Sequence, residues 1–293
     1  MAKYYLSAFA DEAGKDLDVQ IAALKRNRIR FVELRGLATG PIDAQSDASA
    51  KEVKAKLDAN GIGISALGSR LGKTDITAPF EHSLESLRRL CEICHILGAE
   101  RIRMFSYFIP EGENPRNYRE EVMARLQKLC DYAKTQNIRL MHENEARIYG
   151  EKMEQVIDIH ETVSDLGGIF DPSNYRMADV DQALTIKKHM PYVDYLHIKD
   201  CTKEHVIVPA GYGDGMIAEA ITHHDSLFAG DSFLVLEPHL KKFQGYGDID
   251  KHELKTKFSF KDSNESFDFA VKSLKEVLTG IGFKESEDMS WSK

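Results

Sequence analysis

Short apolar runs alternate with amphipathic stretches along almost the whole chain. Eight of these runs are rich in β-branched and aromatic residues, as strands are. They lie at residues 4–10, 30–36, 63–69, 101–107, 138–145, 167–174, 193–200 and 233–240. Between them, apolar residues recur at helical spacing, as in DLDVQIAALKRNR and YREEVMARLQKLCDYAKTQN. Strands that alternate with helices pair in parallel, so we predict a single (β/α)8 barrel, a TIM barrel of the α/β class.

The chain has 293 residues, a length that is typical of one α/β barrel. No linker or change of composition divides it, so we expect residues 1–282 to form the barrel and residues 283–293 to form a loose C-terminal tail. Two segments depart from the repeat, a glycine-rich one at 206–217 and a long polar one at 241–264. Long loops at the rim of a barrel often act as lids.

Composition narrows the class of protein further. Hydrophobic residues make up 42% of the chain and charged residues 29%, which predicts a packed core rather than disorder. The formal net charge is −8 and no basic stripe is present, so we expect no nucleic-acid partner. The N-terminus lacks the apolar run of a signal peptide, and no segment has the apolar length of a membrane span. We therefore expect a cytoplasmic protein with no membrane contact.

The four cysteines are too few for a disulfide framework in a chain of this length. Two of them, Cys91 and Cys94, form a CEIC segment with the spacing of a redox motif or of half a zinc site. The segment lies within SLESLRRLCEICHILGAE, whose apolar residues recur at helical spacing, and no second pair follows. We therefore interpret both cysteines as residues of a helix core.

Acids and imidazoles lie at the expected carboxyl ends of several strands, where barrels build their active sites. These residues are Glu33, His142, Glu143, Glu145, Asp171, His197, Glu237 and His239. Strand alternation turns His142 away from the barrel axis, so it should be structural, and Lys199 and Asp200 are interpreted as loop anchors. Three carboxylates in one mouth repel one another unless a cation lies among them. One divalent metal ion (Mn²⁺, Mg²⁺, Co²⁺ or Zn²⁺) suits three carboxylates and one imidazole and leaves room for a substrate oxygen.

The ordered segments LMHENE, IFDPSN, LHIKD and LVLEPHL resemble the sugar phosphate isomerase/epimerase superfamily of xylose isomerase-like TIM barrels, over nearly the whole chain. That superfamily includes D-tagatose 3-epimerase-like enzymes and inositol-catabolism isomerases. The resemblance implies that the metal ligands are Glu143, Asp171, His197 and Glu237. It also implies that Glu143 and Glu237 are the catalytic pair. The family often has a histidine three residues after the aspartate, whereas this chain has Asn174, which can bind a sugar hydroxyl but cannot titrate near neutral pH.

Each expected ligand also has a structural interpretation. Alternation puts Glu143 and Glu145 on the same face of the strand, so alternation alone does not choose between them. Asp171 precedes a proline and is also suited to cap a helix. His197 can be a histidine of the barrel core, and Glu237 can pair with a rim lysine. The resemblance favours Glu143 over Glu145 and the ligand role for the other three.

The residues expected to contact the substrate are Glu33, Lys73, Glu145, Asn174 and His239. Glu33 can instead form an ion pair with Arg35. Lys73 and Arg70, in GSRLGK, offer a contact for a phosphate or carboxylate group of the substrate. The glycine-rich segment at 209–215, PAGYGDG, can also bind a phosphate through backbone N–H groups, or it can be a tight turn at the rim.

We therefore expect a divalent-metal-dependent sugar or sugar-phosphate isomerase or epimerase that transfers a proton through an enediolate. The expected cofactor is one divalent metal ion, and no nucleotide cofactor is expected because the chain lacks the nucleotide-binding fingerprints. The partner is a small-molecule sugar or sugar phosphate, and the resemblance also allows a homo-oligomer. The alternatives are a metal-assisted hydrolase or lyase on the same site and a non-catalytic carbohydrate-binding barrel. A DNA-repair nuclease like endonuclease IV is disfavoured, because its three-metal cluster needs ligands that the early strands lack.

Overall fold

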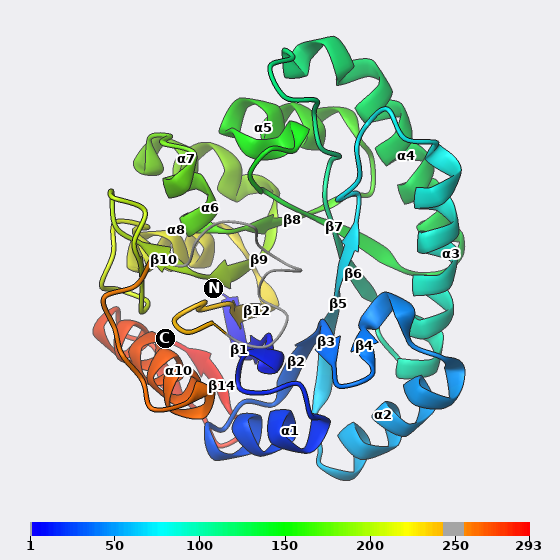
Figure 1. The fold of residues 1–293 in the computed structure, drawn as a ribbon. Helices are drawn as coiled ribbons and strands as arrows, with labels where there is room; N and C mark the ends of the chain where they lie inside the picture. The colour runs from blue at the N-terminus through cyan, green and yellow to red at the C-terminus, as the bar shows by residue number, and fades with distance from the viewer. Residues whose placement is uncertain (1, 243–254) are drawn as a thin grey trace.

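The computed structural model describes residues 2–242 and 255–293, and in these ranges eight parallel strands form the barrel (Figure 1). The strands are β1 (Ala2–Ala8), β2 (Phe31–Leu34), β5 (Gly63–Leu71), β6 (Arg101–Met104), β7 (Arg139–Glu143), β8 (Gly167–Phe170), β9 (Val193–Ile198) and β12 (Gly230–Leu236). Parallel hydrogen-bonded pairs run in the order β1-β12-β9-β8-β7-β6-β5-β2. The strands β1 and β2 lie in contact and close the ring. The prediction of a (β/α)8 TIM barrel is confirmed.

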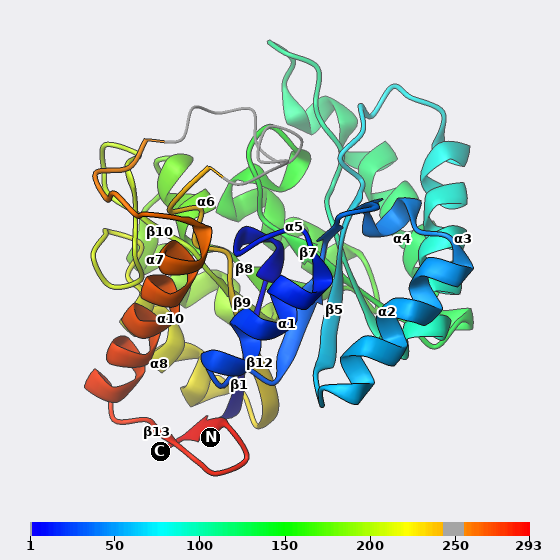
Figure 2. The same cartoon turned by 60° about the horizontal axis from the view of Figure 1, so that its bottom comes forward.

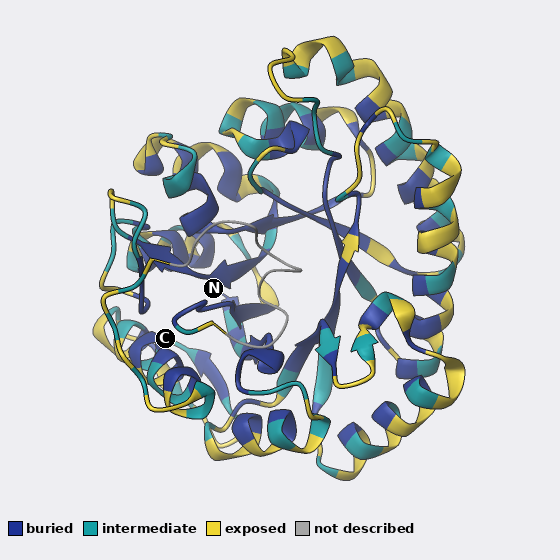
Figure 3. Cartoon of the chain, viewed as in Figure 1, coloured by how far each residue is buried: buried dark blue, intermediate teal, exposed yellow. Residues whose placement is uncertain are grey.

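Helices surround the strands as an outer ring. They are α1 (Leu17–Arg26), α2 (Asp47–Ala59), α3 (Phe80–Leu97), α4 (Arg119–Thr135), α5 (Met153–Thr162), α6 (Pro172–Met177), α7 (Gln182–His189), α8 (Ile217–Leu227) and α10 (Ser263–Gly280). Each of the longer helices buries the face toward the strands and exposes the outer face (Figure 3). Asp16, Ser46 and Asp181 accept backbone N–H groups at the starts of α1, α2 and α7. Gly98 ends α3 in the left-handed conformation, with φ of 70°.

Short elements occupy the loops between strands and helices. They are β3 (Gly36–Leu37), β4 (Gly40–Pro41), β10 (Asp200–Cys201) and β11 (Ile207–Val208), with 3₁₀ helices at Ala10–Glu12, Ile42–Ala44, Pro115–Tyr118, Tyr149–Glu151 and Met190–Tyr192. Strands β7 and β12 end earlier than the apolar runs suggested, so Glu145, Glu237 and His239 lie in the loops that follow them. Of the long polar segment after the eighth strand, residues 243–254 lie outside the described part of the chain.

Apolar side chains fill the barrel below its mouth. This interior cluster consists of Phe9, Ala66, Met141, Ile169, Tyr195, Phe233 and Val235. It makes the barrel a packed core rather than a pore, so a site can form only at the mouth above it. In the outer layer, Cys91 and Cys94 are buried in α3 as free thiols, which confirms their role in the helix core. Within the described ranges, no helix is long and apolar enough to cross a membrane.

Residues 283–293 do not form the loose tail that we expected. Two strands, β13 (Lys284–Glu285) and β14 (Ser290–Ser292), pair antiparallel with each other, and β14 also pairs antiparallel with β1 through Tyr4 and Trp291 (Figure 2). The Trp291 side chain is only 4% exposed. Burial of this large aromatic ring and the backbone pairing together hold the end of the chain against the barrel.

Candidate metal centre at the barrel mouth

Four side chains from consecutive barrel strands converge at the mouth. Glu143 is the last residue of β7, Asp171 directly follows β8, His197 lies in β9, and Glu237 directly follows β12. One ligand atom of each lies within 4.8 Å of the corresponding atoms of the others, and all four residues are buried. His197 Nδ1 lies 3.1 Å from Glu143 Oε1 and 3.3 Å from Glu237 Oε2. The parallel register therefore brings together the four residues that the family resemblance singled out.

The carboxylates of this group are suited to a cation. One oxygen of each is already held by the protein. These contacts join Glu143 Oε2 to Arg103 Nη1 at 3.1 Å, Asp171 Oδ1 to the backbone N–H of Asn174 at 2.9 Å, and Glu237 Oε1 to Arg35 Nη1 at 2.7 Å. The second oxygens, Asp171 Oδ2 and Glu237 Oε2, are buried and have ion-pair contacts alone, with Lys199 Nζ at 3.0 Å and His197 Nδ1 at 3.3 Å respectively. Carboxylate oxygens are preferred ligands of hard divalent cations, and one such ion would contact both oxygens at once.

Three buried cations surround the carboxylates, and they are Arg35, Arg103 and Lys199. The Lys199 ammonium lies 3.0 Å from Asp171 Oδ2. Burial by itself raises the pKa of Glu143, but the charges of His197 and Arg103 outweigh it and lower the pKa to about 2. Burial raises the pKa of Asp171 to about 6 although the Lys199 charge lowers it. Both carboxyl groups are therefore ionised at neutral pH, as metal binding requires.

Comparison with known proteins identifies the family of this barrel. A family model described as a xylose isomerase-like TIM barrel matches residues 21–243. The chain belongs to the xylose isomerase-like TIM barrel family. Comparison with curated proteins finds no significant sequence match.

Several solved structures share the fold of this xylose isomerase-like barrel. A structure of IolI protein with a bound zinc atom is 13% identical, with a TM-score of 0.73, over 94% of this chain and 99% of that one. D-psicose 3-epimerase from Clostridium cellulolyticum H10, with D-tagatose, is 15% identical, with a TM-score of 0.72, over 94% and 99%. The probable 3-DHS dehydratase AsbF from Bacillus anthracis is 14% identical, with a TM-score of 0.70, over 93% and 98%. At these identities the likeness shows the fold alone.

The other residues singled out from the sequence lie around the four. Asn174 donates from Nδ2 to the Asn144 carbonyl oxygen at 2.9 Å, and the same nitrogen lies 3.4 Å from Glu143 Oε1. His239 Nε2 lies 3.5 Å from Glu237 Oε1, so this imidazole is near the ligand group. His142 turns outward as expected, and its Nε2 lies 3.0 Å from Ser106 Oγ in the layer between barrel and helices.

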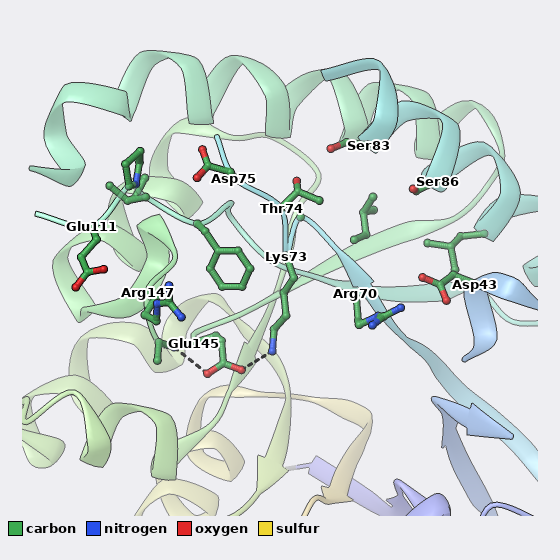
Figure 4. Close-up of a pocket in the computed structure, with 17 residues that line it drawn as sticks. Asp43, Arg70, Lys73, Thr74, Asp75, Ser83, Ser86, Glu111, Glu145 and Arg147 are labelled. Carbon is green, nitrogen blue, oxygen red and sulfur yellow. Dashed lines mark hydrogen bonds and ion pairs between the residues drawn. The ribbon is translucent and has the colours of Figure 1, made fainter. Parts of the chain in front are cut away.

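A cavity of about 520 Å³ with several charged side chains in its lining opens beside the mouth of the xylose isomerase-like barrel. Figure 4 shows the Lys73 and Glu145 side chains pointing toward each other, with Arg70 and Arg147 on either side of them. Lys73 Nζ lies 2.8 Å from Glu145 Oε2 and 4.4 Å from the centre of the Phe105 ring. The two expected substrate contacts therefore pair with each other in the structure. A substrate anion in this cavity would compete with Glu145 for Lys73.

The glycine-rich loop binds a carboxylate of the protein itself. Asp200 accepts backbone N–H groups from Gly211 at 2.9 Å, Gly213 at 3.0 Å and Gly215 at 3.0 Å. A Cβ at Gly213 would lie 2.3 Å from Asp200 Oδ1, so the close approach requires glycine there. These amides are already occupied, so the phosphate hypothesis for PAGYGDG is wrong and the interpretation as a rim turn is confirmed.

Replacing Asp200 by alanine should destabilise the protein by on the order of 3 kcal/mol, because three backbone N–H groups lose their acceptor. Urea unfolding followed by circular dichroism measures this change. Asp214→Ala is the matched control in the same loop, since Asp214 accepts a single backbone N–H, from Lys203 at 2.8 Å. Asp214→Ala should lower the free energy of unfolding by about 1 kcal/mol. Equal losses in the two variants would contradict the anchoring role of Asp200.

Sequence reasoning missed several charged residues of the site. Arg35 does not pair with Glu33 as one interpretation had it. It pairs instead with acids at the mouth, and Arg35 Nη2 lies 3.0 Å from Asp11 Oδ1 and 3.5 Å from Glu12 Oε1. Asp11 and Glu12 directly follow the first predicted strand, residues 4–10, so the strand-end rule that found the ligands would also have found them. Arg103 was detectable from alternation, because it shares the inward face of its strand with Arg101.

Proposed function

We propose that this xylose isomerase-like barrel is a divalent-metal-dependent sugar or sugar-phosphate isomerase or epimerase. The observation that carries the proposal is the ligand group at the mouth, in which three buried carboxylates and one buried imidazole present ligand atoms that all lie within 4.8 Å of one another. One ion (Mn²⁺, Zn²⁺, Co²⁺ or Mg²⁺) would be held by Glu143, Asp171, His197 and Glu237. When bound, it would supply Lewis acidity toward the carbonyl and hydroxyl oxygens of the substrate.

Glu143 and Glu237 are the proposed proton-transfer pair, working through an enediolate. Each has one oxygen fixed by a guanidinium group, Arg103 for Glu143 and Arg35 for Glu237, so the other oxygen has a defined direction. Burial by itself raises the pKa of Glu237, but Lys199 and the hydrogen bonds of the neighbouring imidazoles hold it well below its usual range. Both carboxylates are therefore ionised and ready to accept a proton, although each is a weak base.

A third carboxyl group has the acidity that a proton shuttle needs. Glu12 Oε2 accepts the backbone N–H of His239 at 2.9 Å, and Glu12 Oε1 lies 3.5 Å from His239 Nε2. Burial raises the pKa of Glu12 to about 7, although the charge of His239 lowers it. A group with this pKa both gives and takes protons at neutral pH. We therefore include Glu12, acting through His239, as the group that assists Glu237.

The surroundings of the ligand group favour a polar substrate. In this proposal Asn174, whose Nδ2 lies 3.4 Å from Glu143 Oε1, binds a hydroxyl group of the substrate, and the cavity with Lys73 and Glu145 receives its distal end. Lys73 and the exposed Arg70 carry positive charges there, so a substrate with a phosphate or carboxylate group at its distal end suits the cavity. We also propose a cytoplasmic location, since the four cysteines are free and buried.

The test is proton exchange on a panel of ketoses and ketose phosphates in D₂O, with the protein loaded in turn with Mn²⁺, Co²⁺ and Zn²⁺. We expect deuterium at the carbon next to the carbonyl and formation of an epimer or aldose, both followed by NMR. Protein stripped with a chelator is the control and should show neither. Loss of water or release of phosphate would instead support a lyase or hydrolase on this site. Binding of a sugar without any exchange would support a carbohydrate-binding barrel.

A further inference from the structure

Glu33 lies in the middle of the barrel, beneath the ligand group. It comes from β2, and its side chain is 0% exposed. Glu33 Oε2 lies 3.3 Å from His197 Nε2 and accepts a hydrogen bond from Tyr195 Oη at 3.2 Å. The other ring nitrogen, His197 Nδ1, faces Glu143 and Glu237. The imidazole ring of His197 therefore lies between Glu33 and the carboxylates of Glu143 and Glu237. Direct contact of Glu33 with a substrate, which we expected from the sequence, does not fit this position.

We propose that Glu33 is a positioning residue that holds His197 with its Nε2 protonated and its Nδ1 lone pair directed at the metal site. The inference rests on the proposed metal-dependent function. A neutral imidazole carries its proton on one nitrogen only, and that nitrogen donates while the other accepts. An ionised carboxylate can only accept, so the partner of Glu33 Oε2 must be an N–H. Nδ1 also faces carboxylates, those of Glu143 and Glu237. A metal ion held by those carboxylates would take the place of a proton on Nδ1, while Glu33 keeps the proton on Nε2.

The position of Glu33 is not explained by packing. The neighbouring interior cluster is otherwise apolar or aromatic, with Ala66, Met141 and Ile169 among its members. Glu33 Oε1 accepts no hydrogen bond. A carboxylate at such a place is costly, and an apolar side chain of similar volume would be expected to pack at least as well. The contact with His197 gives the carboxylate a role that an apolar residue cannot fill.

Two neighbours complete the arrangement of the ring. The Phe9 ring meets the His197 ring edge to face, with centres 5.3 Å apart and an angle of 87° between planes. This contact limits tilting of the imidazole. Tyr195 Oη donates a hydrogen bond to Glu33 Oε2, the oxygen that also faces His197 Nε2, and this bond fixes the orientation of the Glu33 carboxylate. Removing the Tyr195 hydroxyl should therefore disturb the ring less than removing the Glu33 charge.

The test measures Co²⁺ binding rather than activity, for wild type, Glu33→Gln, Tyr195→Phe and Ile169→Val. Co²⁺ titration followed by its visible d–d absorption reports both affinity and ligand geometry. We expect Glu33→Gln to weaken Co²⁺ binding by about 10- to 100-fold and to change the band shape, because the amide group can present an N–H to Nε2 and favour the wrong tautomer. Tyr195→Phe should weaken binding only a few-fold. Ile169→Val, a packing change in the same cluster, should leave affinity and spectrum unchanged.

The outcomes separate this inference from the proposed function. Wild type that binds no divalent metal would overturn both. If wild type binds Co²⁺ and the Glu33→Gln variant binds it with the same affinity and the same spectrum, the positioning role is overturned and the proposed function still stands. A measurement on zinc-loaded wild type covers the case in which Glu33→Gln does not fold. Long-range ¹H–¹⁵N correlation of the histidine rings should show His197 protonated at Nε2, and a proton at Nδ1 would overturn the inference.

Discussion

A variant that combines Glu143→Gln with His197→Ala should contain no bound divalent metal, whereas wild type should contain about one ion per chain. The variant removes the carboxylate charge and the imidazole nitrogen that lie 3.1 Å apart at the centre of the ligand group. Loss of the ion should lower any isomerase activity by about 10³-fold or more, because the developing charge of the enediolate loses its main stabiliser. Elemental analysis of the purified proteins after gel filtration measures the metal content.

The matched control is Glu92→Gln with His95→Ala on the exposed face of α3, which removes the same two side-chain types far from the mouth. It should keep the full metal content. Circular dichroism of both variants checks that the barrel is folded. Wild type without metal, even after incubation with Mn²⁺, Co²⁺ or Zn²⁺, would contradict the proposed site. A full complement of metal in the Glu143/His197 variant would do the same.

Lowering the pH from 7.5 to 5 should cost stability at several histidines that are buried in their neutral form, against an opposing contribution from Glu12 and Asp171, whose pKa values are raised to about 7 and about 6. Burial lowers the pKa of His142 to about 3, with a further contribution from His160, and lowers those of His160 and His224 to about 4. The unfolded chain has ordinary histidines, with a pKa near 6.5. Between about pH 6.5 and pH 4 the unfolded state therefore binds more protons, and the free energy of unfolding falls as the pH falls. The loss at pH 5 is about 2 kcal/mol for each of His142 and His224.

Urea unfolding at pH 7.5, 6.0 and 5.0 measures this dependence. His160→Phe should make it shallower, since a phenyl ring keeps the stacking on His189 and Tyr192 and does not titrate. His82→Asn, at an exposed position on α3, should leave the dependence unchanged. If the free energy of unfolding of His160→Phe falls as steeply with decreasing pH as that of wild type, His160 does not contribute to the acid sensitivity.

Much of the fold was predictable because it follows from local patterns. Alternation of apolar runs and amphipathic stretches was enough for the eight strands and for the barrel. The rule that parallel strands end at one rim was enough to place Glu143, Asp171, His197 and Glu237 in one mouth. Alternation along a strand was also enough to turn His142 outward. Each of these predictions depends on near neighbours in the chain and on one general rule about parallel sheets.

Pairing between distant charges was not predictable in the same way. Arg35 reaches Glu237 across 202 residues of sequence, and Arg103 reaches Glu143 across 40. The stagger and tilt of the strands around the barrel decide which inward side chains meet, and neither can be derived from the sequence of a single strand. Glu33 therefore looked like a substrate contact or a partner of Arg35, whereas the stagger places it beneath His197.

The sequence by itself determined the architecture, the rim on which the site is built and the residue types that form it, because periodicity and strand order are properties of the chain. Only the tertiary structure decided which groups satisfy one another. It assigned the amides of the glycine-rich loop to Asp200 and the end of the chain to the edge of β1. Hydrogen bonds and ion pairs act over about 3 Å, and such distances between remote segments exist only after the barrel has closed.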